Sequence, residues 1–239
     1  MGRRNVAAAS KGRGLRPFYI ILGLLAVIGI AAIGYAVVGR GAGGAALEPI
    51  PVEGADDPRT LVERAEGISV GDPSAPAKLL VFSDYQCPYC GQFAAQIAPL
   101  LKAEFVQSGA LELVYYDFPL GGLHRYSFLA SRAARCAGEQ GKFWEYHDVL
   151  FGEQSRWGAS SRPPLDEFEA YAERIGLDRQ AFSACLRSDR FADVVSANKL
   201  LGEQLGVTGT PTLILNGRRV MNWSNYAELK ALIEREAGA

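Results

Sequence analysis

Cys87 and Cys90, separated by Pro88 and Tyr89, are the residues of this sequence best suited to chemistry. The apolar run Lys78–Ser83 before them is typical of a buried strand, and apolar residues after Cys90 recur at helical spacing. Cys87 is therefore expected at the helix N-cap, with Pro88 at the first helical position, which proline favours. Free backbone N–H groups and the helix dipole stabilise a thiolate there. We predict that Cys87 is the exposed nucleophile with a lowered pKa and that Cys90 is the shielded resolving thiol.

Two other interpretations of this Cys-Pro-Tyr-Cys motif are weaker. Zinc needs more ligands than two thiolates, and Cys136, Cys185, His124 and His147 do not stand at ligand spacing. An inert structural disulfide is poorly suited to a helix start, where thiolates are reactive. We therefore expect no metal and no bound cofactor, and we interpret the two histidines as packing or hydrogen-bonding residues.

A second motif, Gly209-Thr210-Pro211-Thr212, stands at the entrance to a predicted strand. Proline lacks an N–H and is normally excluded from strand interiors. A cis bond between Thr210 and Pro211 would account for it, because such bonds are usually deliberate features. The backbone of Thr210 could then pair with an extended substrate beside the sulfurs. An ordinary trans proline at a strand start is the alternative.

The surrounding pattern predicts an α/β framework. A strand at Lys78–Ser83, a helix from Pro88 to about Gln107 and a strand at Leu111–Phe118 form a parallel crossover unit. Near the C-terminus, a hairpin with an Asn216-Gly217 turn precedes a helix at Tyr226–Glu236. Between these halves the sequence predicts further helices around Leu129–Ala137, around Phe143–Phe151, at Asp166–Ile175, at Asp178–Leu186 and at Phe191–Leu205.

Three segments, FSDYQCPYC, DFPLGGLHRYSFLASRAARCAGEQGKFWEYHDVLF and LGVTGTPTLILNG, resemble the DsbA-like thiol–disulfide oxidoreductases. The resemblance covers about residues 67–239. It implies a thioredoxin-like α/β fold (βαβ, then ββα) with an inserted all-helical domain. It also implies Cys87 as nucleophile, Cys90 as its partner and Pro211 as a cis-proline. Pro88, Tyr89 and Thr210 are the neighbouring residues expected to contact substrate.

The sequence departs from this family at one position. Many relatives carry a buried Glu six residues before the first Cys, where this chain has Val81. In the family that acid is thought to assist proton transfer from the second thiol, so the proton path is open to question here. Asp84 is the nearest acid, and both a capping or turn role and a redox role are open for it.

Cys136 and Cys185 fall on the apolar stripes of two predicted insertion helices. Two unpaired thiols in one domain of an oxidising compartment usually bond, so we predict a structural disulfide. Two buried free thiols are the alternative.

The N-terminal region is predicted to anchor the chain. Residues 1–16 carry five basic and no acidic side chains, and the 23 residues 17–39 carry no charge. A helix of that length spans a hydrocarbon core of about 30 Å. The basic flank predicts a cytoplasmic N-terminus and an extracytoplasmic catalytic domain at the cell membrane. A cleaved secretory signal is the alternative, and it gives the same compartment.

The predicted organisation has five parts. They are a basic tail (1–16), a transmembrane helix (17–39), a linker (40–66), a thioredoxin-like domain (67–122 and 206–239) and a helical insertion (123–205). The net charge of −1, with clustered basic residues in the tail alone, argues against a nucleic-acid binder.

The leading hypothesis is a membrane-tethered enzyme that introduces disulfides into extracytoplasmic proteins by dithiol–disulfide exchange. By resemblance, its reoxidant is a membrane quinone-linked oxidase of the DsbB or vitamin-K-epoxide-reductase type. A disulfide reductase or isomerase on the same fold is the alternative within redox chemistry. A non-catalytic peptide-binding module is the alternative outside it.

Overall fold

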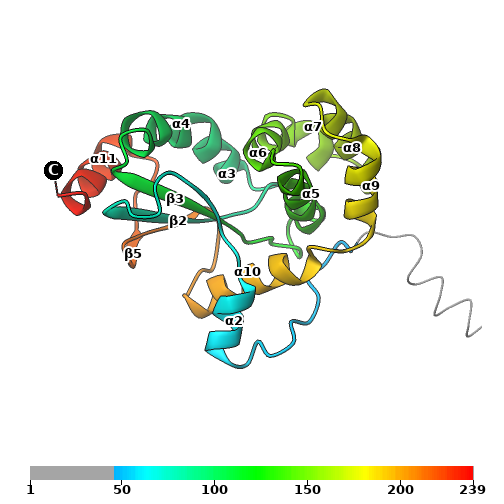
Figure 1. Cartoon of the computed structure of the whole chain (residues 1–239), viewed down its shortest axis with the longest axis horizontal. Coiled ribbons are helices and arrows are strands. Elements are labelled where there is room, and N and C mark those ends of the chain that lie inside the picture. Colours follow the sequence, from blue (N-terminus) through cyan, green and yellow to red (C-terminus); the bar gives the residue numbers. More distant parts are fainter. Residues whose placement is uncertain (1–45, 239) are drawn as a thin grey trace, which may run out of the picture. The chain divides into compact units, whose positions relative to one another are not determined.

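The computed structural model describes residues 46–238, which contain a five-stranded sheet (Figure 1). The strands lie in the order β1-β3-β2-β4-β5. β2 and β3 run parallel, whereas the other neighbouring pairs are antiparallel. The strands are β1 (Ile68–Val70), β2 (Ala77–Ser83), β3 (Leu111–Asp117), β4 (Thr212–Leu215) and β5 (Arg218–Val220). The predicted parallel crossover and the C-terminal hairpin are therefore both present.

A continuous helical run covers one face of this sheet together with α11 (Tyr226–Glu236) (Figure 1). The run contains two π-helical segments, and Pro99 favours the first of them. Proline has no N–H, and its ring would collide with the carbonyl four residues earlier in a regular α-helix. The Ala98 N–H instead donates to the carbonyl of Phe93, five residues back. The run comprises α3 (Pro88–Gln92), η1 (Phe93–Ile97), α4 (Ala98–Leu101) and η2 (Lys102–Val106).

α10 (Ala192–Gln204) crosses the opposite face of the sheet (Figure 1). Gly202 marks the close approach, because a Cβ there would lie 2.6 Å from Cδ2 of Phe118 and 3.0 Å from Cδ1 of Phe82. The structure therefore places this helix in the layers around the sheet, whereas the sequence predicted residues 123–205 as one insertion. Helical periodicity shows that a face is apolar, but it does not show whether a sheet or a helix covers it.

The five helices between β3 and α10 form the insertion at one end of the sheet (Figure 1). Large side chains from different helices, including Trp157, Phe168 and Phe182, are fully buried in its core. The predicted α/β framework with a helical insertion is therefore present. The insertion helices are α5 (Ser127–Glu139), α6 (Phe143–Gly152), α7 (Gln154–Gly158), α8 (Leu165–Arg174) and α9 (Arg179–Arg187).

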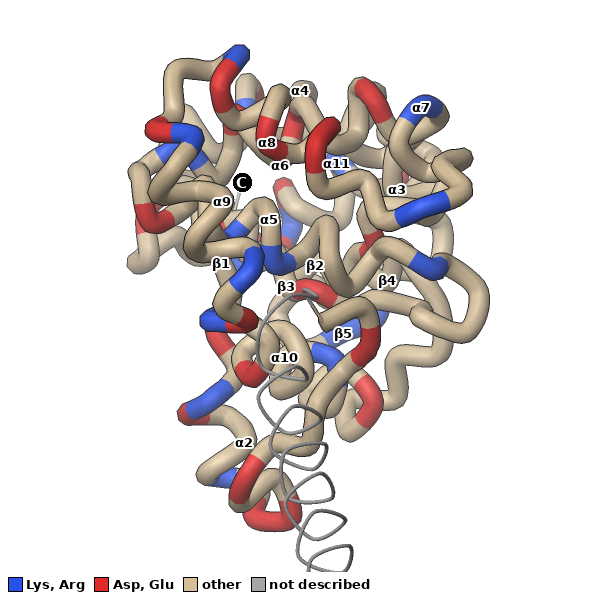
Figure 2. Tube along the Cα trace, turned by 90° about the vertical axis from the view of Figure 1, so that its right-hand side faces the viewer, with Lys and Arg blue, Asp and Glu red and all other residues tan. Residues whose placement is uncertain are grey.

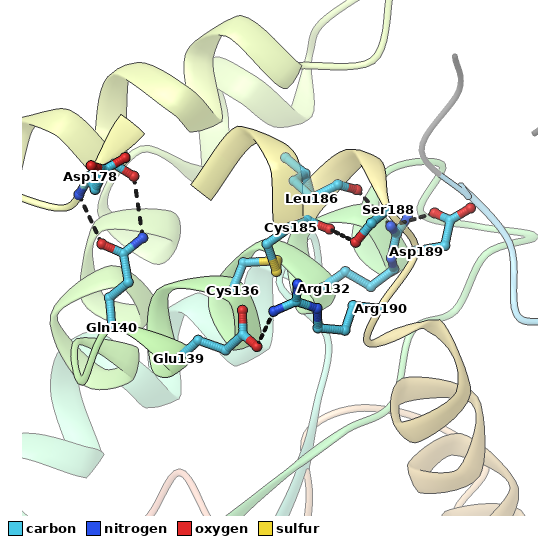
Figure 3. Close-up of a disulfide and its surroundings, with 10 residues drawn as sticks. All are labelled: Arg132, Cys136, Glu139, Gln140, Asp178, Cys185, Leu186, Ser188, Asp189 and Arg190. Carbon is cyan, nitrogen blue, oxygen red and sulfur yellow. Dashed lines mark hydrogen bonds and ion pairs between the residues drawn. A yellow bond between two sulfur atoms is a disulfide. The ribbon is translucent and has the colours of Figure 1, made fainter. Parts of the chain in front are cut away.

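A disulfide joins Cys136 on α5 to Cys185 on α9, with the two Cα atoms 5.8 Å apart (Figure 3). Both residues are buried. Near this bond, the Gln140 side chain exchanges two hydrogen bonds with the backbone of Asp178, at 2.8 and 3.3 Å. The disulfide thus lies in a well-packed contact between two insertion helices.

The segment before the sheet differs from the extended linker predicted at 40–66. Asp57 caps α2 (Pro58–Arg64), and Leu61 on that helix is fully buried. Upstream, the Ala46 N–H donates to Asp189 at 2.7 Å, and the Ile50 N–H donates to Ser196 at 2.9 Å. Residues 46–66 are therefore packed on the domain. Their Pro, Gly and acidic composition is that of a linker, but the distant partners for their backbone are visible only in the fold.

Within residues 46–238, no helix has the length and apolar character needed to cross a membrane. The basic tail and the transmembrane helix predicted at 1–16 and 17–39 lie outside the described residues. Over the described part of the chain, basic and acidic residues are interspersed along most elements (Figure 2).

Candidate active site

The two cysteines of the motif lie where β2 leads into α3. Cys87 is the N-cap of α3 and Pro88 occupies the first turn. The Cys87 N–H donates to the Asp84 carbonyl at 3.1 Å, and the Gly91 N–H donates to the Cys87 carbonyl at 3.1 Å. This tight turn brings both sulfurs to the start of the helix. Both cysteines are free thiols.

The two thiols have opposite acid–base character. A hydrogen bond with the Cys90 thiol is the main cause that lowers the pKa of Cys87 to about 5. The N–H groups of Cys90 and Tyr89 act in the same direction, whereas burial opposes them. Burial raises the pKa of Cys90 well above its ordinary value, and the neighbouring Cys87 adds to that rise. At neutral pH this geometry favours a Cys87 thiolate beside a protonated Cys90.

Shielding of the nucleophile differs from expectation. The sequence predicts an exposed Cys87, yet this residue is only 5% exposed and Cys90 is fully buried. The Cys87 Sγ lies 3.3 Å from the carbonyl of Thr210, which belongs to a loop more than a hundred residues away in the sequence. Pro88 and Tyr89 are instead the exposed members of the motif, with Tyr89 at 65%.

The Thr210–Pro211 peptide bond is cis, and Pro211 is buried. The loop forms one side of a cleft of about 390 Å³, and Tyr89 and Trp223 are among the residues on the other sides. The hydroxyl of Thr210 is buried without a hydrogen-bond partner. The structure thus brings the four residues expected to contact substrate close to the Cys87 thiol, namely Pro88, Tyr89, Thr210 and Pro211.

Asp84 is fully buried at the end of β2. Its carboxylate accepts hydrogen bonds from the backbone of Gln86 and Leu120, each at 2.7 Å, and pairs with His124 Nδ1 at 2.9 Å. The Asp84 N–H lies 3.4 Å from Cys90 Sγ. The side chain therefore fixes the turn that carries the motif, which is the capping role. The hydrogen bond that His124 donates to the Asp84 carboxylate raises the pKa of His124. Of the packing and hydrogen-bonding roles predicted for this histidine, the structure shows hydrogen bonding.

Val81 lines a cavity of about 320 Å³ behind Cys90. It faces that cavity together with Ser83, because alternate residues of β2 share one face of the sheet. Tyr115 and His147 also line the cavity. Sequence reasoning overlooked this polar group. The sequence signals that could have revealed these polar side chains were the period of two in the strands and a histidine on an apolar helix face.

Comparison with known proteins agrees with this fold and site. Residues 63–235 match the family model described as Thioredoxin. The Na(+)/H(+) antiporter NhaA 3 of Salinispora tropica is 34% identical over 163 residues, which is 68% of this chain and 24% of that protein. Disulfide bond formation protein D of Bacillus subtilis is 25% identical over 173 residues, 70% of this chain and 75% of the relative. The chain thus spans about a quarter of the length of the antiporter relative.

Solved structures give the same fold. Oxidised BdbD from Bacillus subtilis superposes with a TM-score of 0.65 at 24% identity, covering 72% of this chain and 92% of that one. Oxidised DsbA from Mtb superposes with a TM-score of 0.60 at 23% identity, covering 73% and 94%.

These likenesses converge on one fold, the thioredoxin-like fold. Because the family match extends over more than two thirds of the sequence, this chain belongs to the thioredoxin family.

Proposed function

We propose that this chain is a membrane-tethered oxidase that introduces disulfides into extracytoplasmic proteins. The observation that carries the proposal is the difference in acidity between the two thiols at the start of α3. The pKa of Cys87 is lowered to about 5, and that of Cys90 is raised. A stabilised thiolate favours the reduced enzyme, so the disulfide form is readily reduced by substrate thiols.

The reaction begins when a substrate thiolate attacks Cys87 Sγ in the disulfide form. The Cys87–Cys90 bond breaks and Cys90 leaves as a thiolate, which is then protonated. A second substrate thiolate attacks the substrate sulfur of the mixed disulfide and releases Cys87. The substrate is thereby oxidised, the enzyme is reduced, and both electrons remain on the cysteine pair.

The cleft beside the sulfurs would hold the substrate. Tyr89 and Trp223 offer aromatic surface, and the Thr210–Pro211 loop offers backbone groups to an extended peptide. The same cleft would receive the membrane quinone-linked oxidase, of the DsbB or vitamin-K-epoxide-reductase type, that returns the enzyme to its disulfide form.

The uncharged segment 17–39 and the basic residues before it support the tether. The test is protease and thiol-reagent access in intact cells that carry the full chain. We expect the thiol reagent to label Cys87 from outside the cell, and we expect the full-length protein to be recovered with the membrane. Recovery of only a shortened soluble protein would replace the anchor with a cleaved signal.

The reduction potential of the Cys87–Cys90 pair tests the direction of electron flow. It is best measured in a fragment that begins at residue 45, because Ala46 and Ile50 form hydrogen bonds with the domain. We expect a potential above thioredoxin's value of about −270 mV. A Cys87→Ser variant should lose all exchange.

Two outcomes would replace the proposed oxidase function with another function. A potential near or below that of thioredoxin, with efficient reduction of protein disulfides, would assign a reductase or isomerase. Thr210 keeps such a shift open, because its carbonyl lies 3.3 Å from Cys87 Sγ and a residue in contact with that sulfur can tune the potential. Full function of the Cys87→Ser variant would instead assign a non-catalytic peptide-binding module.

A further inference from the structure

The turn that carries Cys87 is held by a side chain from the helical insertion. Gln154 is the first residue of α7, and its Nε2 donates to the carbonyl of Tyr85 at 2.7 Å and to the carbonyl of Cys87 at 2.9 Å. These two carbonyls flank Gln86 in the turn that leads from β2 into α3. One amide group of the insertion therefore fixes the backbone on both sides of the residue that precedes the nucleophile.

A second amide makes the reverse connection. The Gln86 Nε2 donates to the carbonyl of Gly158 at 3.2 Å, and the Gln86 Oε1 accepts a hydrogen bond from the N–H of Tyr126. Gly158 is the last residue of α7, so the two glutamine side chains join the turn to both ends of this short helix. The backbone N–H of Gln86 also donates to the Asp84 carboxylate at 2.7 Å. The turn is thus fixed from the end of β2 and from the insertion.

Gly91 provides the room that Gln154 needs. A Cβ at this position would lie 3.0 Å from Oε1 of Gln154, which is tighter than an ordinary van der Waals contact. Glycine is a poor helix former, and this close approach gives a physical reason for its presence in the helical run. The Gly91 N–H donates to the Cys87 carbonyl at 3.1 Å. That carbonyl therefore accepts one hydrogen bond from its own helix and one from the insertion.

The acidity of Cys87 depends on the geometry of this turn. The hydrogen bond with the Cys90 thiol and the N–H groups of Cys90 and Tyr89 lower the pKa of Cys87. These donors converge on Sγ while Cys87 stays at the N-cap, with φ −71° and ψ 122°. If the amide of Gln154 were absent, the two carbonyls would need other donors, and the turn would have to move to find them. The amide also offsets the negative ends of two carbonyl dipoles near the thiolate.

We propose that Gln154 is a positioning residue for the nucleophile, through which the helical insertion sets the reduction potential of the Cys87–Cys90 pair. It acts through the carbonyls of Tyr85 and Cys87 and not on the sulfur itself. By holding the turn, it keeps the thiolate aligned with the donors at the start of α3, which favours the reduced enzyme. The inference rests on the proposed exchange reaction and adds that the insertion takes part in tuning it.

Several titratable or charged groups lie on the elements packed around the turn. All of them remain when Gln154 is replaced by an apolar side chain, so a change in the titration of Cys87 then reports on the turn itself. They are Asp84 at the end of β2, Tyr85 in the turn, Cys90 on α3, His124 before α5, and Glu153 and Arg156 beside Gln154.

The test removes the amide from the full chain in detergent. Gln154→Met removes both donated hydrogen bonds and keeps a side chain of similar length. Gln140→Met is the matched control, because Gln140 is also half-buried and also bonds the backbone of a distant residue, Asp178, within the insertion. Thiolate absorbance against pH gives the pKa of Cys87. Equilibration with glutathione and its disulfide gives the reduction potential.

We expect Gln154→Met to raise the pKa of Cys87 from about 5 to about 6. The thiolate is then about tenfold less stabilised, so the equilibrium constant for reduction by glutathione should fall about tenfold, which is about 30 mV toward the potential of thioredoxin. Gln140→Met should keep the wild-type pKa and potential even if it is less stable.

A second variant covers the case in which Gln154→Met does not fold. Gln154→Glu keeps the size and shape of the side chain, but an ionised carboxylate donates no hydrogen bond. It also brings a negative charge beside the two carbonyls. We therefore expect this variant to raise the pKa of Cys87 and to lower the potential further than Gln154→Met does.

Variants of Gln154 that keep the wild-type pKa and potential would overturn the positioning role and leave the exchange function standing. A shift in Gln140→Met as large as that in Gln154→Met would also overturn it, because the effect would then come from lost stability of the insertion. A wild-type protein that exchanges no disulfides with thiol peptides would overturn the exchange function as well. The two failures are therefore distinguishable.

Discussion

Breaking the Cys136–Cys185 disulfide should cost stability without slowing the chemistry. The two cysteines are separated by 49 positions in the sequence. In the chain-entropy relation, a closed loop of about 50 residues contributes about 4 kcal/mol by restricting the unfolded chain. Unfolding of a domain the size of residues 46–238 has an entropy near 0.4 kcal/mol/K, so the expected fall in Tm is about 10 °C.

The assay is thermal unfolding of three variants, Cys136→Ala, Cys185→Ala and the double replacement, each beside wild type. If the cross-link itself is the stabilising element, either single change opens the loop. The singles and the double should then fall by nearly the same amount. Their rates of thiol oxidation should match wild type, because the bond joins α5 to α9 within the insertion.

Two results would refute this reasoning. A double variant that unfolds within about 2 °C of wild type would show that the loop constraint contributes little. If the fall in Tm of the double variant equals the sum of the falls of the two single variants, packing of the two side chains, and not the covalent bond, is what matters.

Four further predictions follow from local geometry. In the reduced protein, Cys87 should be alkylated with a midpoint near pH 5 while Cys90 stays unlabelled; preferential labelling of Cys90 at pH 6 would contradict the assignment. His124 has a raised pKa, so its stabilising effect should be full below about pH 6.5 and fade as the pH rises. In urea unfolding, the His124→Gln variant should therefore lose more free energy of unfolding, relative to wild type, at pH 5.5 than at pH 8. For His147 the pH dependence has the opposite sign, because burial lowers its pKa to about 3. The free energy of unfolding of the wild type should therefore fall by up to about 1.4 kcal/mol per pH unit as the pH drops below 6.5. A His147→Leu variant should lack that slope. Gly202→Ala should cost about 1–3 kcal/mol, because its Cβ would meet the Phe118 ring on the face of the sheet that α10 covers; unchanged unfolding would place the helix elsewhere.

Local sequence determined the elements and the reactive motif. The range Tyr226–Glu236 was predicted from its helical period and is the observed α11. The Asn216-Gly217 turn lies between β4 and β5, and both of its residues adopt positive φ, which this residue pair favours. The position of Cys87 at a helix N-cap followed from the strand before it and Pro88 after it. Each of these depends on neighbours a few positions away, so the sequence alone carries the physical cause.

Tertiary structure decided the features that depend on distant partners. β1 consists of three residues that pair with the edge of β3, a contact that no local pattern reports. The shielding of Cys87 comes from the loop at Thr210. Tyr85 and His147 are brought within 3.0 Å across 62 positions of sequence. Their spacing along the chain gives no sign of a hydrogen bond, because packing of the insertion against the sheet is what places α6 beside the buried thiol.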